Sequence, residues 1–454
     1  LILNQDFTSL TDKVCSIVER PTPPRGWYVA FAISCAVTAM LFSMVIYLIS
    51  TGIGVWGVNS PVGWGFAIIN FVFWVGIGHA GTLISAILFL FRQKWRTSIN
   101  RFAEAMTIFA VICAGVFPGI HVGRVWFAYW MFPLPNQMDM WPNFRSPLLW
   151  DVFAVSTYFT VSLLFWYLGM IPDLASLRDR AGTRIRQIVY GVLALGWRGT
   201  EKEWTYHTTT LNIFSYIIIP VMFSVHTIVS WDFAMAIQPG WHSTIFGPYF
   251  IIGALFSGVA AVIIVMAIIR KAMRLKYFLR EEHFNGMAKF LLILSFAWAY
   301  FYFADYIVPW YGGEPLMHVI FDLFRRGWAA PLWFLMLFGN IILPWATLWS
   351  KRVRSSIPAL IIICIYVQIG MYLERYLIVP VISGYNELPF SWGVYIPRAG
   401  ILMTIALFAM VALSYILFSR VVPLIPVWEI LEGQILKGIQ RIGRALIPSQ
   451  AEPH

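Results

Sequence analysis

The amino-acid sequence predicts an all-α integral membrane protein, and three observations lead to this prediction. Hydrophobic residues make up 59% of the 454 residues and charged residues only 12%, whereas water-soluble domains carry about 25% charged residues. Aromatic residues account for 17% of the chain, with 22 Trp, and Trp and Tyr favour membrane–water interfaces. Ten apolar segments are each long enough to cross the hydrocarbon core, which takes about 20 helical residues.

The ten expected spans divide the chain into two flanking helices and two groups of four. We expect the spans at 27–50, 62–91, 102–132, 149–171, 211–236, 246–270, 287–311, 328–350, 357–380 and 397–420. The predicted units are a cytoplasmic segment 1–26, a first span with its outer loop 27–61, a first four-helix bundle 62–236, a second four-helix bundle 246–380, a last span 397–420 and a cytoplasmic amphipathic segment 421–454. Residues 175–195 and 424–447 mix apolar and basic positions, which predicts interfacial helices on the cytoplasmic side.

The basic residues set the orientation of the spans. Every second loop is basic, with Arg92, Lys94, Arg96 and Arg101 in one, Arg178, Arg180, Arg184, Arg186, Arg198 and Lys202 in the next, then Arg270, Lys271, Arg274, Lys276 and Arg280, and finally Lys351, Arg352 and Arg354. The alternate loops hold only Arg145, Arg325 and Arg326. By the positive-inside rule both termini face the cytoplasm, and the net charge of +11 indicates this topology rather than affinity for nucleic acid.

A faint internal repeat supports the two bundles. The segment GWGFAIINFVFW from Gly63 resembles GPYFIIGALFSG from Gly247, and SPLLWDVF from Ser146 resembles AAPLWFLM from Ala329, at an offset of about 183 residues. We therefore expect spans two to five and six to nine to be two related bundles in parallel repeat.

Ionisable side chains within the spans are concentrated in the first bundle. Such groups are costly in a membrane and mark a bundle interior or a wet cavity. They are His79, His121, Arg124, Asp151, His226 and Asp232. The orientation places most of them in the outer half, with His79 and His226 deeper. In the second repeat Asp151 aligns with about Phe334 and His79 with about Ile263, so we expect the functional site in the first bundle.

His121, Arg124 and Asp151 suit a quinol. On a helix His121 and Arg124 stand three residues apart and share a face, and the next helix can bring Asp151 to the same pocket. A neutral substrate with a hydroxyl at each end can give one proton to the imidazole, while Asp151 orients the imidazole or takes the second proton. We therefore predict quinol binding by these three residues, with His79 as a further candidate.

Each of these residues also has a structural interpretation. A single histidine in a span can make a helix–helix hydrogen bond, Arg124 can extend to the interface, and Asp151 can cap the fourth span. Glu374 and Arg375 are adjacent in the ninth span. They can form structural ion pairs with neighbouring helices, or they can belong to a proton path. The same structural interpretation applies to Asp305 in the seventh span. The functional interpretation is favoured by the co-location of His121, Asp151, His226 and Asp232.

We expect neither a metal nor a haem in this chain. The four cysteines, Cys15, Cys35, Cys113 and Cys364, are far apart and form no ligand cluster. His79 and His226 are the one plausible pair for a b-type haem, and the sequence offers no second pair.

Four segments resemble a known family of membrane proteins. GWYVAF in the first span, VGWGFAIINFVFWVGIGHAG in the second, FPGIHVGRVWFAYW in the third and SPLLWDVFAVSTYF in the fourth are similar to the NrfD/PsrC family of quinone-interacting membrane subunits. The ten-span length is closest to the ActC-type members, the larger NrfD-like subunits of bacterial alternative complex III.

The resemblance implies oxidation of menaquinol or another quinol near the outer surface. It places the family's quinol-site residues on His121 and Asp151, and it places Asp232 and Arg375 at the site or on its proton path. The smaller polysulfide-reductase-type members use a Tyr, Asn and His set, from which this chain departs.

The resemblance also implies a multi-pass protein of the bacterial inner (cytoplasmic) membrane. Its implied partners are an iron–sulfur subunit, a multihaem cytochrome c subunit, a second NrfD-like membrane subunit, small membrane subunits and lipid, with no nucleic acid. The outer loops 133–148 and 312–327 carry few charges and are expected to dock the iron–sulfur partner.

The rival prediction is a proton channel or secondary transporter without redox chemistry. Intramembrane His, Asp, Glu and Arg residues would suit it, although one bundle depleted of polar groups does not. Quinol oxidation coupled to proton translocation through His79, His226, Asp232, Glu374 or Arg375 combines the two.

Overall fold

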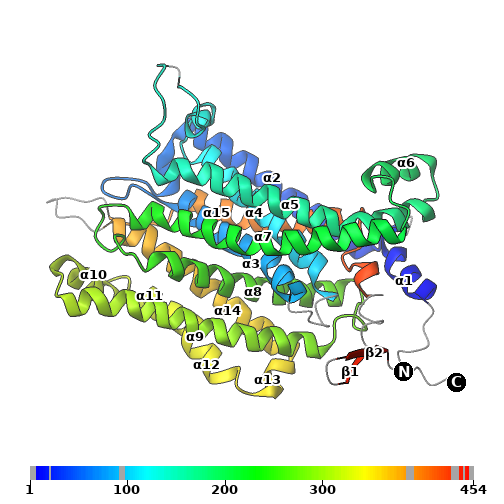
Figure 1. The fold of residues 1–454 in the computed structure, drawn as a ribbon. Coiled ribbons are helices and arrows are strands. Elements are labelled where there is room, and N and C mark those ends of the chain that lie inside the picture. Colours follow the sequence, from blue (N-terminus) through cyan, green and yellow to red (C-terminus); the bar gives the residue numbers. More distant parts are fainter. Residues whose placement is uncertain are drawn as a thin grey trace.

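The computed structural model describes residues 7–19, 22–90, 98–136, 138–384, 393–430, 439–442 and 445–448. Within them ten helices are long and apolar enough to cross a membrane, which confirms the predicted all-α membrane fold. They are α2 Arg25–Thr51, α3 Phe66–Leu90, α4 Asn100–Ile120, α5 Pro147–Arg180, α7 Glu201–Ala234, α8 Phe246–Ala272, α9 Glu281–Gly312, a composite span at Ala330–Thr347, a second composite span at Ile357–Val381 and α15 Arg398–Phe418 (Figure 1).

The two composite spans are built from shorter pieces, and short helices lie between the spans. The first composite span comprises α11 Ala330–Leu337, η4 Phe338–Ile342 and α12 Leu343–Thr347, and the second comprises α14 Ile357–Tyr376 and η5 Leu377–Val381. The short helices are α1 Phe7–Glu19, η1 Ile53–Trp56, η3 Val125–Met131, α6 Arg184–Leu193, α10 Pro315–Arg325 and α13 Lys351–Ser355.

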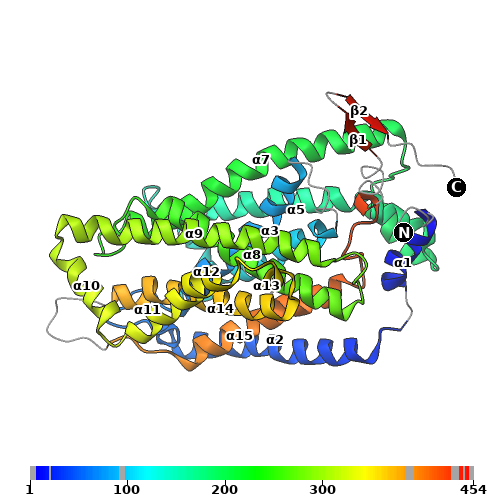
Figure 2. The same ribbon diagram turned by 90° about the horizontal axis from the view of Figure 1, so that it is seen from below.

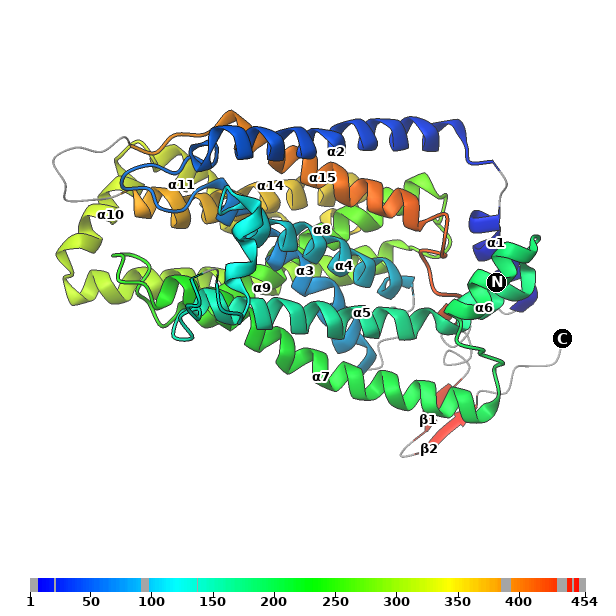
Figure 3. The same cartoon turned by 90° about the horizontal axis from the view of Figure 1, so that it is seen from above.

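Helix α3 lies at the centre of the molecule. In the most apolar 18 residues of α3 94% are buried, against 17% in α2 and in α15. The first bundle consists of α3, α4, α5 and α7, and the second of α8, α9, α14 and the α11–α12 span, with α3 and α7 packed on α8. Helices α2 and α15 lie side by side along one edge, opposite α7 (Figure 3). The central helix therefore belongs to the core and the flanking pair faces lipid.

Small residues let α3 approach its neighbours closely. A Cβ on Gly81 would lie 2.0 Å from the carbonyl oxygen of Ala103 in α4, and a Cβ on Gly258 of α8 would lie 2.0 Å from Cβ of Ala80. Close backbone approach is the usual way in which membrane helices gain packing contacts, because lipid offers no hydrophobic drive between them. The GIGHAG stretch is thus a packing motif that carries His79 into the core.

Helix α1 and the strand pair lie at one end of the molecule and α10 lies at the other (Figure 2). Helix α6 lies at the same end as α1 (Figure 3). The basic loops identify the end that holds α1 as the cytoplasmic end. The stretch 175–195, where a separate interfacial helix was expected, is divided between the last turns of α5, which ends at Arg180, and α6 Arg184–Leu193.

The prediction of a helix over 424–447 is wrong for the second half of this segment. Residues 439–442 and 445–448 pair instead as antiparallel strands, β1 Ile439–Ile442 and β2 Ala445–Pro448, while 427–430 are helical and 431–438 lie outside the described residues. The strand residues IQRI and ALIP show neither a helical nor a two-residue period over so short a stretch, so the sequence pattern did not separate the two structures.

The segment after α15 folds back over the cytoplasmic end of the first bundle. The buried ion pair of Arg101 and Asp173 (2.8 Å) holds it, because the Asp173 carboxylate accepts the backbone N–H groups of Val427 (3.1 Å) and Trp428 (3.3 Å). The Trp428 indole N–H donates to the carbonyl of Gly169 at 2.9 Å.

Helix α1 packs into the same cytoplasmic cap through Val14, Cys15 and Val18. Burial raises the pKa of the Cys15 thiol to about 12. The thiol therefore stays protonated at neutral pH, and Cys15 serves as a packing residue.

Both π-helical pieces lie in the second bundle and precede a proline or contain one. Pro344 has no N–H to donate to the carbonyl of Asn340 four residues earlier, and that carbonyl accepts the hydroxyl of Ser295 at 2.6 Å instead. Pro380 lies inside η5, just after the Glu374–Arg375 pair. Such π segments are frequent at functional sites.

Candidate functional site

Two aspartates meet at the outer end of the first bundle. Asp151 lies near the start of α5 and Asp232 near the end of α7, and these antiparallel helices bring both to the same level. The two carboxyl groups are close enough to share a hydrogen bond. One oxygen of each, Oδ1, is buried and has no other partner among the described residues. Asp151 is not a helix cap, because α5 begins at Pro147 with Ser146 in the capping position.

Two histidines meet about two turns deeper. The ring centroids of His79 and His226 are 4.7 Å apart, and Tyr158 stacks on His79 at 4.3 Å. The His79 Nδ1–H donates to the carbonyl of Val75 at 2.6 Å, so Nε2 is the unprotonated nitrogen, and no described residue binds it. Neither ring nitrogen of the fully buried His226 has a hydrogen-bond partner among the described residues. The sequence analysis placed both histidines deeper than the other candidate residues, and the structure brings their rings together.

Buried polar atoms without partners are costly and occur mostly where a ligand or water is bound. Ten described side chains of the first bundle carry such atoms, and five of these side chains are titratable. His207 lies near the cytoplasmic start of α7, and the other four, on α3, α5 and α7, are His79, Asp151, His226 and Asp232. Within the described residues no group of three His, Cys, Asp or Glu side chains could hold a metal ion. The arrangement therefore suits an organic ligand with hydrogen-bonding groups.

The structure contradicts the expected helical face of His121 and Arg124. Helix α4 ends at Ile120, His121 follows it, and Gly123 adopts a positive φ of 79°. Arg124 is extended and exposed, at the start of η3. The apolar run 102–132 is long enough for one span, but Gly123 takes a conformation that ends a helix. The two side chains therefore do not share a helical face.

His121 lies at the outer end of α4, next to the helix that carries Asp151. Its Nδ1 faces the carbonyls of Phe117 (3.2 Å) and Pro118 (3.0 Å), which leaves Nε2 as a hydrogen-bond acceptor. No hydrogen bond in the described part of the chain joins His121 to Asp151. Its contribution to a pocket with Asp151 stays a prediction.

Glu374 and Arg375 pair with each other at the boundary between the bundles. The Arg375 guanidinium binds the Glu374 carboxylate, which also accepts the Tyr249 hydroxyl and the Trp298 indole N–H (3.2 Å). The guanidinium lies 4.9 Å from the ring centroid of Phe250, a residue that also contacts the His226 ring. The pair is buried and connects the histidine cluster of the first bundle with the interior of the second.

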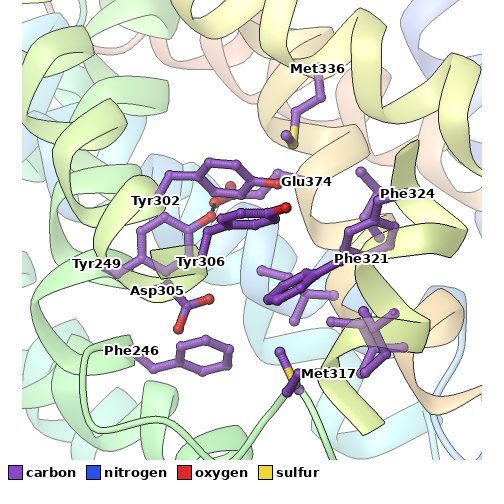
Figure 4. A pocket seen from close by; sticks show the side chains of 15 residues that line it. Phe246, Tyr249, Tyr302, Asp305, Tyr306, Met317, Phe321, Phe324, Met336 and Glu374 are labelled. Atoms are coloured by element: carbon purple, nitrogen blue, oxygen red, sulfur yellow. Dashed lines mark hydrogen bonds between the residues drawn. The ribbon is translucent and has the colours of Figure 1, made fainter. Parts of the chain in front are cut away.

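A small cavity of about 40 Å³ opens beside this pair in the outer half of the second bundle. Figure 4 shows Asp305, Tyr302 and Tyr306 of α9 around it, with Tyr249 and Glu374 at the back. The Asp305 carboxylate accepts the hydroxyl of Ser243 at 2.7 Å. Sequence comparison of the two repeats missed this cluster of polar side chains. The available signal was the helical spacing of Tyr302, Asp305 and Tyr306, which places them on one face of an apolar span.

Polar side chains continue from His79 toward the cytoplasmic end. The Tyr158 hydroxyl donates to the carbonyl of Gly78 (3.0 Å), and Thr107 Oγ1 accepts the backbone N–H of Thr82 (2.8 Å). Nearer the cytoplasm the Ser85 hydroxyl donates to Glu104 at 2.5 Å, above the Arg101–Asp173 pair. The first bundle thus carries polar groups along most of its length.

A groove between α5 and α7 leads past this cluster on the lipid-facing side. Its volume is about 360 Å³, and its lining is mostly apolar, with Trp150, Ala154, Val225 and Ile228 among the residues. Trp150 directly precedes Asp151, and Val225 directly precedes His226. A hydrophobic molecule in the membrane therefore has an apolar surface to follow beside the buried polar groups.

Comparison with known proteins agrees with the fold and the motifs. The sequence model of the family described as "Polysulphide reductase, NrfD" matches residues 54–389, well over half of the chain. A Halobacterium salinarum protein, named as a putative membrane subunit of dimethyl sulfoxide reductase, is 25% identical over 244 residues, which are 53% of this chain and 51% of that protein. The chain thus aligns with about half the length of this relative. Because the family match spans both bundles, this chain belongs to the NrfD family of polysulphide reductase membrane proteins.

Proposed function

We propose that this chain is the quinol-binding, quinol-oxidising membrane subunit of a respiratory or photosynthetic electron-transfer complex of the alternative complex III type. One observation carries the proposal: Asp151 and Asp232 bring buried, unpartnered carboxylate oxygens together beside an apolar groove. A quinol, menaquinol included, has two hydroxyls and a long apolar tail. The carboxylates can accept hydrogen bonds from the quinol hydroxyls while the apolar tail lies along α5 and α7.

The chemistry assigned to these side chains is proton transfer. Oxidation of a quinol to a quinone releases two protons and two electrons. Asp151 and Asp232 accept the hydroxyl hydrogen bonds, and His226 lies two turns of α7 below Asp232 to take a proton onward. Carboxylates and imidazoles accept protons and not electrons, so the electrons pass to a redox group of a partner protein.

His121 is a further hydrogen-bond acceptor for the quinol in this proposal. Its Nε2 is free to receive a hydrogen bond at the outer end of α4. Arg124 is exposed at the outer surface, where it can meet an acidic group of the partner or the carbonyl of the bound quinone.

The outer loop after α4 supports docking of an iron–sulfur subunit. Trp126 is 57% exposed, Trp141 63% and Phe144 54%. Exposed aromatic side chains on a loop outside the membrane are typical of protein–protein interfaces. We propose that this loop is covered by the iron–sulfur subunit, and that a multihaem cytochrome c subunit, a second NrfD-like subunit and small membrane subunits complete the complex.

A proton path is the second part of the proposal. His226, Asp232, Glu374 and Arg375 adjoin one another across the boundary between the bundles. The polar groups that continue to Asp173 also support a pure proton channel. A channel would conduct protons in vesicles that hold the complex and no quinol, whereas a quinol-oxidising subunit would move protons only with electron flow.

The decisive experiment replaces Asp151 and Asp232 by asparagine, singly and together, in the purified complex. Each single change should lower quinol oxidation by about 100-fold, since each removes a positioned proton acceptor. The double variant should be hardly slower than either single one, because both groups act as a unit. Asp179→Asn, at the exposed end of the same helix α5, is the matched control, and the protein composition of the complex is checked in every sample. Near-normal oxidation by an assembled Asp151→Asn complex would overturn the proposal.

A further inference from the structure

The cavity in the second bundle has polar walls on three elements. Tyr249 comes from α8, Tyr302, Asp305 and Tyr306 from α9, and Glu374 from α14, while the lining residues of α10 are apolar (Figure 4). These five side chains are the titratable groups that line the cavity, and Arg375 is the nearby cation, bound to Glu374. Nothing in the proposed quinol site makes use of Asp305.

Within the described part of the chain, Asp305 has no ionic partner that would give it a structural role. Its one hydrogen-bond partner among the described residues is the Ser243 hydroxyl, and none of the ion pairs found there involves Asp305. A carboxyl group inside a transmembrane helix is costly and is usually retained for transport of a proton or an ion.

The cavity is large enough for water. Its volume of about 40 Å³ exceeds the roughly 10–15 Å³ that one water molecule requires on the same measure. Carboxylate and phenol oxygens supply the two to four polar partners that a bound water requires.

The side chains on this side of the cavity are more exposed toward the outer surface than at Glu374. Glu374 is 1% exposed, Asp305 is half-buried, and Ser243 is half-buried in the outer loop between α7 and α8. Glu374 also binds Arg375, the residue that reaches the histidine cluster through Phe250. The cavity therefore lies between the core and the outer surface.

We propose that Asp305 is a proton-exchange residue, which with cavity water passes protons from the Glu374–Arg375 pair to the outer surface past Ser243. The inference rests on the proposed quinol oxidation as the source of the protons. A proton that reaches Glu374 moves over water to the Asp305 carboxylate and from there to water outside. O–H bonds break and form in equal number, and no electron moves.

The test uses the intact complex in sealed vesicles with a pH dye on the outer side. After a quinol pulse, Asp305→Asn should slow outward proton release by about tenfold while the first turnover of quinol oxidation keeps its rate, because Asn cannot bind a proton at this position. Asp305→Glu should restore release. Asp322→Asn, which removes an exposed carboxylate of α10, is the control. The redox-induced infrared difference spectrum should lose a carboxyl band in Asp305→Asn.

Two results would overturn the inference in different ways. Normal proton release by Asp305→Asn, with an unchanged infrared spectrum, would exclude the Asp305 route and leave the quinol site intact. If the wild-type complex transferred no electrons from quinol while the Asp151 and Asp232 variants behaved like wild type, the quinol function itself would fail, and the inference with it.

Discussion

The two bundles share a scaffold, and in their outer halves they differ in the partners of their buried carboxyl groups. In the first bundle His79, Asp151, His226 and Asp232 leave atoms without partners among the described residues, beside a lipid-facing groove. In the second bundle Glu374 is bound by an arginine, a tyrosine and a tryptophan. Unpartnered groups are available to a ligand, whereas satisfied groups hold a structure together.

The difference also bears on the expectation that the second bundle is depleted of the polar groups found in the first. The positions aligned with His79 and Asp151 are indeed apolar there, but Asp305, Glu374 and Arg375 are polar groups on other helices of that bundle. A repeat preserves the helical frame, while the polar side chains can move to any helix that faces the interior. Residue-by-residue alignment of repeats therefore underestimates the chemistry of the second copy.

Removing one partner of the ion pair in the second bundle should have the largest effect. Glu374→Gln leaves the Arg375 guanidinium buried without a counter-charge, and we expect the free energy of unfolding to fall by about 3–5 kcal/mol. Asp232→Asn in the first bundle should leave stability unchanged or raise it, since it relieves two carboxyl groups that face each other. Denaturant titration of the detergent-solubilised protein, followed by Trp fluorescence, measures both.

A double substitution of the ion pair tests whether the loss of stability comes from the unpaired charge. Glu374→Gln together with Arg375→Met removes both charges and should recover most of the lost stability. If Glu374→Gln alone proved harmless, the second bundle would not depend on this pair, and the contrast between the bundles would disappear.

Packing at the central helix should give the next largest effect. Gly81→Ala places a Cβ against the carbonyl of Ala103, and we expect a loss of about 1–3 kcal/mol from overpacking. Gly115→Ala in α4 is the matched control, because nothing lies within 4 Å of its added Cβ. Equal stability of the two variants, measured by thermal unfolding, would show that α3 has room to shift.

The smallest effect is expected at the π-helical piece of the second bundle. Ser295→Ala leaves the Asn340 carbonyl without its hydroxyl partner, at a cost of about 1 kcal/mol in unfolding free energy. Ser414→Ala removes a hydroxyl that only bonds to Met410 of its own helix α15 and should cost less. A larger loss in the Ser414 variant would argue against a special role for η4.

Sequence patterns predicted the ten spans because their signal is local and strong. A run of about 20 apolar residues must be helical in lipid, where every backbone N–H and C=O needs an internal partner. The end of α4 was predicted incorrectly because hydropathy does not detect a turn at Gly123 inside an apolar run. The strand pair at 439–448 was missed because such short strands have no distinctive period.

The candidate site was predictable as a set of residue types, and its pairing was not. By itself the sequence determined the fold class, the orientation and the choice of His79, Asp151, His226 and Asp232, because charged groups in an apolar span are costly and therefore rare. Only the tertiary structure decided that Asp151 meets Asp232 and that His79 meets His226. It also decided that Asp305 lines a cavity with Glu374. Such contacts depend on the rotation and depth of each helix, which are set by packing between helices far apart in sequence.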